Sequence, residues 1–279
     1  MICYKITSDT SHSFYDKKLK YKVGETYECG GSPIPHKNGF HVCKNVLDLL
    51  YFGTFIGTLP LDYTSYVVEV CGDYVEYDDK FIVTNKLKVL KLLTFDDVCN
   101  MYDVTSDLIH NIVFDERTDI RSYANTDNEL IQAVIACCKT QFDEDILFGM
   151  TKSKYDIVRF LLISRASKPK DIQDKLFVLL RNDSCVITVN MIIQWIDDII
   201  RFSSDPDQTR QFARSFCLET YERFKNSRMI KINMARSQFC RSLLYDKLAN
   251  DVICEVRCVT KYPSIFGGNI EEFNWSDKE

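Results

Sequence analysis

The sequence predicts an α+β protein in which a small β-rich N-terminal domain is followed by a helical C-terminal domain. Up to about Leu93, short runs of β-branched and aromatic residues are separated by turn residues, and seven of the ten glycines fall at or before Gly72. From Thr94 onward, apolar residues recur at spacings of three and four, which is the period of a helix. A chain of 279 residues with 46% hydrophobic content can bury a full core.

Three segments of the first domain have the composition and alternation of strands. They are Tyr66–Cys71, Phe81–Thr84 and Lys86–Val89. The first ends at Gly72, and the third alternates charged and apolar residues as a half-buried strand does. The glycines between such runs supply the positive φ that tight turns require, so we expect a turn-rich domain.

The domain boundary is expected near Thr94, because Thr94 and the following Asp96 and Asp97 have the pattern of a helix N-cap. The predicted divisions are a β-rich domain at 1–93, a helical domain at 94–266 and an acidic tail at 267–279. No long flexible linker separates the two domains in the sequence. We therefore expect them to pack together.

Six later segments are expected to form helices. Asp205 is a strong N-cap candidate, because Pro206 follows at the first helical position and Gln208 stands where a capping box needs it. The segment 252–259 fits either a last strand or a helix. The expected helices are 127–139, 155–166, 170–180, 186–202, one from Asp205 to about Asn226, and 235–249.

Net charge, cysteine distribution and the length of apolar runs limit the classes of function that the chain could have. The net charge of -5 gives no general attraction to nucleic acid or to anionic membranes. The twelve cysteines are scattered and do not form the dense framework of a small secreted domain, and no signal peptide is visible. No apolar run is long enough to span a bilayer, since Val186–Phe202 is interrupted by polar residues. A cytoplasmic protein with reduced thiols is expected.

The glycine-rich stretch 21–52 carries a family resemblance. Val23-Gly24-x-Thr26-Tyr27, Gly39-Phe40-His41-x-Cys43 and Leu47-Asp48 resemble an uncharacterised N-terminal domain of phage and giant-virus proteins with the pattern VGxTY, GFHxC and LD. Here His36 stands where the pattern has a cysteine, and Val46 replaces a proline. The resemblance implies a viral protein of the host cytoplasm with no assigned activity.

The layout after this domain is similar to mimivirus-type ankyrin-repeat proteins. The segment 154–166, KYDIVRFLLISRA, resembles the helix GHxDIVxFLLxxGA of an ankyrin repeat, although Arg165 stands where the repeat has glycine. No second copy recurs clearly at a 33-residue period. The resemblance implies degenerate ankyrin-like helix pairs that hold a partner protein.

Four side chains in the glycine-rich stretch could bind one structural zinc ion. Cys29, His36, His41 and Cys43 supply two thiols and two imidazoles, the ligand types that tetrahedral zinc prefers. In the alternative interpretation no cofactor is bound, and His41 and Cys43 are core residues of the β domain.

Catalytic interpretations of the same stretch stay open. Cys43 could act as a nucleophile with His41 or His36 as its base and Asp48 as the orienting carboxylate. An enzyme acting on a nucleotide-like ligand, similar to an ADP-ribosyl transferase, would use Glu69 or Glu76 at a strand end. Its ligand cleft would be formed by Phe40, His41, Asp48 and Tyr51.

A basic stretch from Arg210 to Lys247 suggests a further type of partner. Aromatic residues are interleaved with its lysines and arginines, which is typical of surfaces that contact phosphates and stack bases. Phe212 and Phe216 lie at helical core spacing, so a solvated basic face that attracts an acidic partner is the competing interpretation. Arg210, Arg214 and Arg228 are the residues to test.

A non-enzymatic protein-interaction module is the preferred function. Neither a Walker A motif, a GxGxxG motif nor an HExxH motif occurs, so nucleotide hydrolysis, dinucleotide redox chemistry and zinc-protease activity lack their usual sequence support. The helical domain would present the interaction surface, and the small domain would serve as a rigid recognition head. The partner is expected to be another protein, with nucleic acid as the alternative and no membrane.

Overall fold

The computed structural model describes residues 1–14, 16, 18–35, 37–53, 63–77, 79–115, 117–138, 144–164, 170–203 and 205–249. A sheet precedes a series of helices, which confirms the predicted α+β class. Backbone contacts divide the chain into two compact units, Met1–Leu162 and Ile163–Glu279. The boundary expected near Thr94 stays a prediction, and the tail at 267–279 and the segment 252–259 lie outside the described residues.

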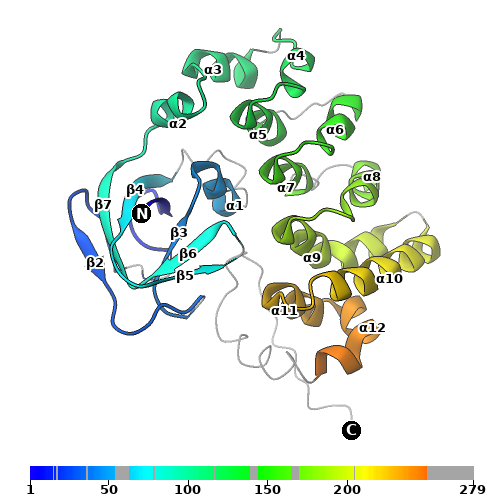
Figure 1. The fold of residues 1–279 in the computed structure, drawn as a ribbon. Helices are drawn as coiled ribbons and strands as arrows, with labels where there is room; N and C mark the ends of the chain where they lie inside the picture. The colour runs from blue at the N-terminus through cyan, green and yellow to red at the C-terminus, as the bar shows by residue number, and fades with distance from the viewer. Residues whose placement is uncertain are drawn as a thin grey trace. The chain divides into compact units, whose positions relative to one another are not determined.

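The first unit contains an antiparallel sheet of seven strands. Its order is β2-β7-β4-β1-β3-β6-β5, so the N-terminal strand lies at the centre (Figure 1). The predicted strands correspond to β4, β6 and β7, while the sequence analysis did not identify β1, β2 or β5. The bounds are β1 Ile2–Thr7, β2 Thr26–Glu28, β3 Phe40–Cys43, β4 Thr64–Val70, β5 Tyr74–Tyr77, β6 Phe81–Thr84 and β7 Lys86–Leu92.

One face of the sheet holds a compact aromatic and aliphatic core. Tyr21 is buried at its centre, with its ring 4.9 Å from that of Tyr27 and 6.5 Å from that of Phe40. Burying such rings removes a large apolar area from water, so this core anchors the loop between β1 and β2 to the sheet. Its other buried members are Cys3, Val42, Tyr66, Val68, Val70, Ile82, Leu87 and Val89.

The other face of the sheet is covered by two short helices and by residues from later in the chain. The 3₁₀ helix η1 (Val46–Leu49) and α1 (Leu50–Gly53) follow β3 directly. Tyr51 is buried, with its ring 6.1 Å from Phe81 of β6 and 4.7 Å from Phe160 of α7 (Asp156–Ser164). An apolar cavity of ≈ 300 Å³ lies beside η1 and is also lined by Leu130 of α5 (Glu129–Cys138).

The longer helices of the first unit begin with α2, directly after Thr94, where the domain boundary was predicted. Thr94 caps α2 in a capping box with Asp97, as its sequence pattern predicts. The expected helices at 127–139 and 155–166 are α5 and α7, which begin two residues and one residue later than predicted. The bounds are α2 Phe95–Met101, α3 Ser106–Phe114, α4 Arg121–Ala124, α5 Glu129–Cys138, α6 Glu144–Met150 and α7 Asp156–Ser164.

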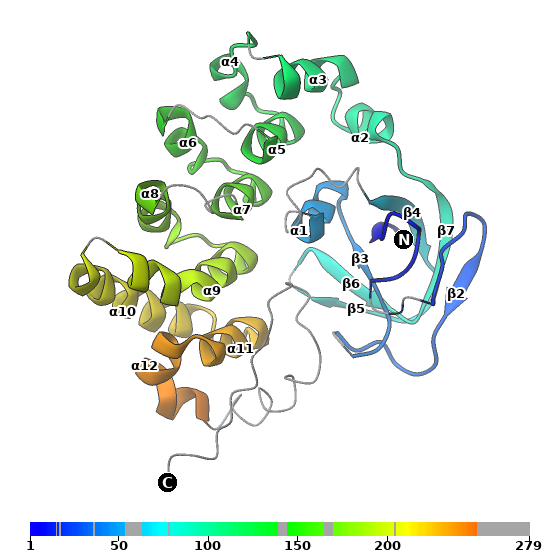
Figure 2. The ribbon, with the colours of Figure 1, turned by 180° about the vertical axis from the view of Figure 1, so that it is seen from behind.

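The second unit is helical in its described residues. Helix α9 contacts α8, α10, α11 and α12, which accounts for its apolar composition (Figure 2). Asp205 caps α10 with its side chain on the backbone N–H of Gln208, as predicted. The expected helix at 235–249 corresponds to α12, and the sequence analysis missed α11 before it. The bounds are α8 Lys170–Leu180, α9 Val186–Phe202, α10 Pro206–Arg223, α11 Arg228–Arg236 and α12 Gln238–Ala249.

Within the residues that the structure describes, no helix has both the length and the apolar character needed to cross a bilayer. This agrees with the sequence prediction for Val186–Phe202. That helix is α9, whose Asp197 takes part in a polar contact with the start of α12.

Candidate functional site

A polar pocket of ≈ 210 Å³ lies in the first unit, between η1, the turn before β6 and the starts of α5 and α7. Its charged lining residues are Asp48, Lys80, Glu129, Lys154 and Asp156. A concave site with several convergent charges is where a ligand is expected to bind, so this pocket is the candidate functional site.

Asp48 reaches the pocket because of the cap at the start of η1. The backbone N–H of Asn45 donates to Asp48 Oδ2 at 3.2 Å, and the side chain of Asn45 accepts in return from the backbone of Asp48. Asp48 is 5% exposed. The local fold therefore holds a carboxylate in a fixed position at the edge of the sheet.

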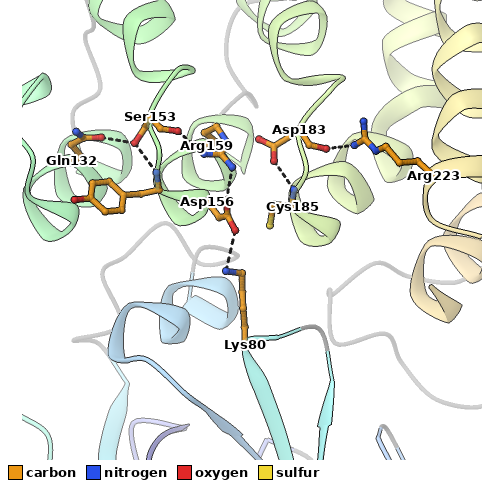
Figure 3. Close-up of polar contacts among 9 residues, drawn as sticks. Lys80, Gln132, Ser153, Asp156, Arg159, Asp183, Cys185 and Arg223 are labelled. Atoms are coloured by element: carbon orange, nitrogen blue, oxygen red, sulfur yellow. Dashed lines mark hydrogen bonds and ion pairs between the residues drawn. The ribbon is translucent and has the colours of Figure 1, made fainter. Parts of the chain in front are cut away.

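The two lysines of the pocket already have carboxylate partners. Lys80 Nζ lies 3.2 Å from Asp156 Oδ2, and Arg159 binds the other oxygen of the same carboxylate (Figure 3). Lys154 Nζ lies 2.5 Å from Asp127 Oδ1. The ion pairs of the two lysines are thus with Asp156 and Asp127, while the charge of Lys80 also acts on Asp48 and Glu129.

Asp48 and Glu129 are the two carboxylates of the pocket without such a partner. Among the described residues, Glu129 makes no ion pair, and Asp48 accepts from a neutral backbone amide. Desolvation by burial raises the pKa of Asp48, and the nearby Lys80 opposes that rise. Desolvation also raises the pKa of Glu129, and the negative charge of Asp48 adds to that rise. Both shifts mean that the pocket disfavours two ionised carboxylates in the absence of a cation.

A polar network fixes the start of α7, from which Asp156 enters the pocket. Ser153 Oγ donates to Gln132 Oε1 at 2.6 Å and accepts from the backbone N–H of Tyr155 at 3.2 Å (Figure 3). Arg159 Nη1 donates to the carbonyl oxygen of Ser153. These contacts connect α5 to α7, so the walls of the pocket are pre-organised.

The four residues of the predicted ligand cleft do not lie together. Asp48 lines the pocket, and Tyr51 lies close by, with Lys80 Nζ 5.5 Å from its ring centroid. Phe40 packs on the opposite face of the sheet, against Tyr21. The carbonyl oxygen of His41 accepts from the buried Lys5 Nζ at 3.1 Å.

The zinc hypothesis concerns residues that the structure describes in part. His36 lies outside the described residues. In the described part of the chain, no group of three or more His, Cys, Asp or Glu side chains is arranged to hold a metal ion. His41 and Cys43 alternate with Phe40 and Val42 along β3, so they lie on the same face of the sheet. Zinc binding stays a prediction.

The nucleophile and the two glutamates of the catalytic interpretations lie on three different strands. Cys43 of β3 is 1% exposed, and burial raises its pKa well above its ordinary value, so the thiol form prevails at neutral pH. Glu76 Oε2 of β5 pairs with Lys44 Nζ at 2.5 Å, and Glu69 of β4 lies opposite Ile2 and Lys88 in the sheet. Neither glutamate lines the polar pocket.

The predicted basic stretch from Arg210 to Lys247 covers parts of α10 and α12 and all of α11. Arg210 is exposed and lies 3.7 Å from Asp207 one turn earlier, and Arg214 is exposed on the same helix. The side chain of Arg228 lies outside the described residues. Phe212 and Phe216 pack against Phe177, at 5.0 and 5.4 Å between ring centroids, as their helical spacing predicts.

Four charged pocket residues were not identified as site residues from the sequence. Lys80 and Glu129 belong to no motif, while Lys154 and Asp156 lie in the ankyrin-like segment 154–166, where no site was predicted. The local signal for the site was Asp48, which forms part of the Leu47-Asp48 pattern. Convergence of the other four depends on the packing of α5 and α7 beside η1, and sequence spacing does not report that packing.

Comparison with known proteins gives a match for the first part of the chain. Residues 1–101 match a family model described as "Domain of unknown function (DUF7666)". The chain is similar to that family over these residues, which confirms the coarser prediction of an uncharacterised N-terminal domain. Neither the curated proteins nor the solved structures contain a match to this chain.

Proposed function

We propose that this chain is a non-enzymatic protein-recognition module whose polar pocket accepts a basic side chain of a partner protein. The resemblance of residues 23–48 to phage and giant-virus proteins supports the further proposal that it is a viral protein of the host cytoplasm. The helical residues after Thr94 supply one wall of the pocket, as expected for a body that presents an interaction surface.

The observation that carries the proposal is the pairing of charges in the pocket. Lys80 and Lys154 pair with Asp156 and Asp127, and Asp48 and Glu129, which form no ion pair among the described residues, line the same pocket. A cation placed there would offset the cost of burying both carboxylates and would donate charge-assisted hydrogen bonds to them. Guanidinium is the best match, because its planar donors can contact two carboxylates at once.

The size of the pocket also favours a side chain over a nucleotide. At ≈ 210 Å³ it is smaller than the roughly 300–1,000 Å³ typical of pockets for drug-sized ligands. An arginine or lysine side chain on an extended partner segment needs less room. The negative charge of Asp48 and Glu129 would repel the phosphates of a nucleotide.

Binding of small arginine probes tests this proposal. N-acetyl-arginine amide is titrated into the full chain and followed by NMR chemical shifts, with N-acetyl-citrulline amide as the neutral probe of similar shape. We expect saturable shifts for arginine alone. Glu129→Gln should weaken binding by about tenfold, because it removes one member of a buried charge contact. Asp107→Asn, on an exposed position of α3, is the matched control and should leave binding unchanged.

The pH dependence of arginine binding and the behaviour of the controls test the proposal further. Binding should weaken as the pH falls through the raised pKa values of Asp48 and Glu129, because the protonated carboxyls no longer attract a cation. Equal binding of citrulline and arginine, or full affinity in Glu129→Gln, would overturn the proposal. Turnover of a nucleotide by the purified chain would favour the enzymatic alternative instead.

A further inference from the structure

Two cysteines of the second unit lie in direct contact. Cys217 on α10 and Cys240 on α12 are both fully buried, and their Sγ atoms lie 2.9 Å apart. A disulfide bond requires a sulfur separation of about 2.05 Å, so a small movement of either side chain suffices to form one. Neither cysteine lines the polar pocket, and the pair takes no part in the proposed function.

Polar contacts on both sides of the pair fix the position of α12. On one side, Asp197 of α9 accepts from the backbone N–H groups of Gln238 and Phe239, at 2.8 and 2.9 Å. On the other side, Lys247 Nζ of α12 lies 2.5 Å from Glu222 Oε1 of α10. The first contact fixes the start of α12 on α9, which also packs against α10, and the second joins α12 to α10 directly, so the closeness of the two sulfur atoms does not depend on one flexible side chain.

We propose that Cys217 and Cys240 form a redox-sensitive pair that a peroxide converts to a disulfide joining α10 to α12. The sulfur of one cysteine attacks a peroxide oxygen, which gives a sulfenic acid and, from hydrogen peroxide, one water. The second sulfur then attacks the sulfenic sulfur, the S–S bond forms, and the hydroxyl leaves as a second water. Overall, two thiols are oxidised by two electrons and one hydrogen peroxide is reduced to two waters.

The environment of the pair sets the speed of this reaction. The contact with Cys240, followed by desolvation, raises the pKa of Cys217, so little thiolate is present at neutral pH. Because the thiolate is the reactive form, oxidation should be slow and should accelerate as the pH rises. Once one sulfur is oxidised, the other is already in place to capture it before a second peroxide arrives. In a reducing compartment the pair stays as thiols until peroxide accumulates.

Peptide mapping of the full chain tests the proposal. The protein is treated with hydrogen peroxide at two pH values, and remaining thiols are then alkylated in denaturant. We expect a cross-linked peptide pair containing Cys217 and Cys240, lighter by two hydrogen masses than the two thiol peptides, and faster formation at the higher pH. The disulfide should raise the midpoint of thermal unfolding by roughly 10 °C, and a reductant should reverse the shift.

Substitutions separate this pair from other thiols. Cys240→Ser and, independently, Cys217→Ala should abolish the cross-link, while Cys99→Ser in the first unit should leave it intact. Oxidation of Cys217 to a sulfinic acid with no cross-link would overturn the proposal, as would cross-links that join either cysteine to a different partner. Arginine binding by Glu129→Gln bears only on the pocket, so failure of one proposal leaves the other standing.

Discussion

Gly39 shows at the scale of one residue why the GFHxC pattern begins with glycine. Its φ is +117°, a conformation that other residues rarely adopt. A Cβ atom at this position would lie 2.6 Å from Val83 Cγ1 and 2.9 Å from the carbonyl oxygen of Thr84, both on the neighbouring strand β6. The glycine therefore permits the close approach of the chain to β6 just before β3 pairs with it.

Replacing Gly39 by alanine should destabilise the fold strongly. The strained φ and the contact with the backbone of β6 together should lower the free energy of unfolding by about 3 kcal/mol. Urea unfolding of Gly39→Ala and the parent measures this. Gly30→Ala is the matched control, because a Cβ atom at that position would have no heavy atom within 4 Å and its φ is not in the left-handed region. Equal losses in both variants would contradict the steric explanation.

At the scale of elements, a side chain of one helix in the second unit caps the start of another helix. Asp197 lies in the middle of α9, yet its carboxylate accepts from two backbone N–H groups at the start of α12 and from Ser237 Oγ at 3.1 Å. These N–H groups have no partner within their own helix, so a carboxylate from a neighbouring helix satisfies them. The same contact fixes Ser237, the residue at which the chain passes from α11 to α12.

Loss of the Asp197 cap should be costly. Asp197→Ala leaves N–H groups of α12 without their acceptor and should lower the free energy of unfolding by about 2 kcal/mol. Thermal and urea unfolding give this value. The adjacent Asp198 is exposed, so Asp198→Ala should change stability by less than about 0.5 kcal/mol. If the two variants were equally stable, the cap would have no energetic role.

The elements that the sequence predicted are those with strong local signals. Val186–Phe202 and Lys170–Leu180 combine helical apolar spacing with clear ends, and their predicted bounds agree with α9 and α8. Helix α11 was missed because Ser227 and Ser237, which bound it, are equally typical of a polar loop in a basic stretch. Strand β1 was missed although the turn residues Ser8 and Asp9 follow Ile2–Thr7, and its central place depends on pairing with β4 from far along the chain.

Like the place of β1 in the sheet, the candidate site depends on contacts between residues far apart in the chain. The Leu47-Asp48 pattern indicated Asp48, but Glu129 and Lys80 reach it only through tertiary packing. Glu129 lies in the first turn of α5, where an acidic residue is expected for helix stability alone. Its second role, in the pocket, follows from the position of that helix beside η1.

At the scale of the whole molecule, contacts of α5 and α7 bear on where the first folding unit ends. Phe160 of α7 covers Tyr51, and Leu130 of α5 lines the apolar cavity beside η1. These helices follow the matched domain at 1–101, yet their side chains reach η1 and α1, the two short helices beside the sheet. Backbone contacts accordingly place residues up to Leu162 in one compact unit.

Fragments of two lengths distinguish this unit from the boundary expected near Thr94. A fragment of residues 1–164 should unfold cooperatively and retain arginine binding, because it contains all five charged pocket residues. A fragment of residues 1–101 exposes Tyr51 and should be less stable by about 3 kcal/mol or more, with binding of a hydrophobic dye. Phe160→Ala in the full chain is the control for the lost ring and should cost about 3 kcal/mol. A fragment of residues 1–101 as stable as the longer one would show that the sheet domain folds alone and that the helices after Thr94 are added to a complete structure.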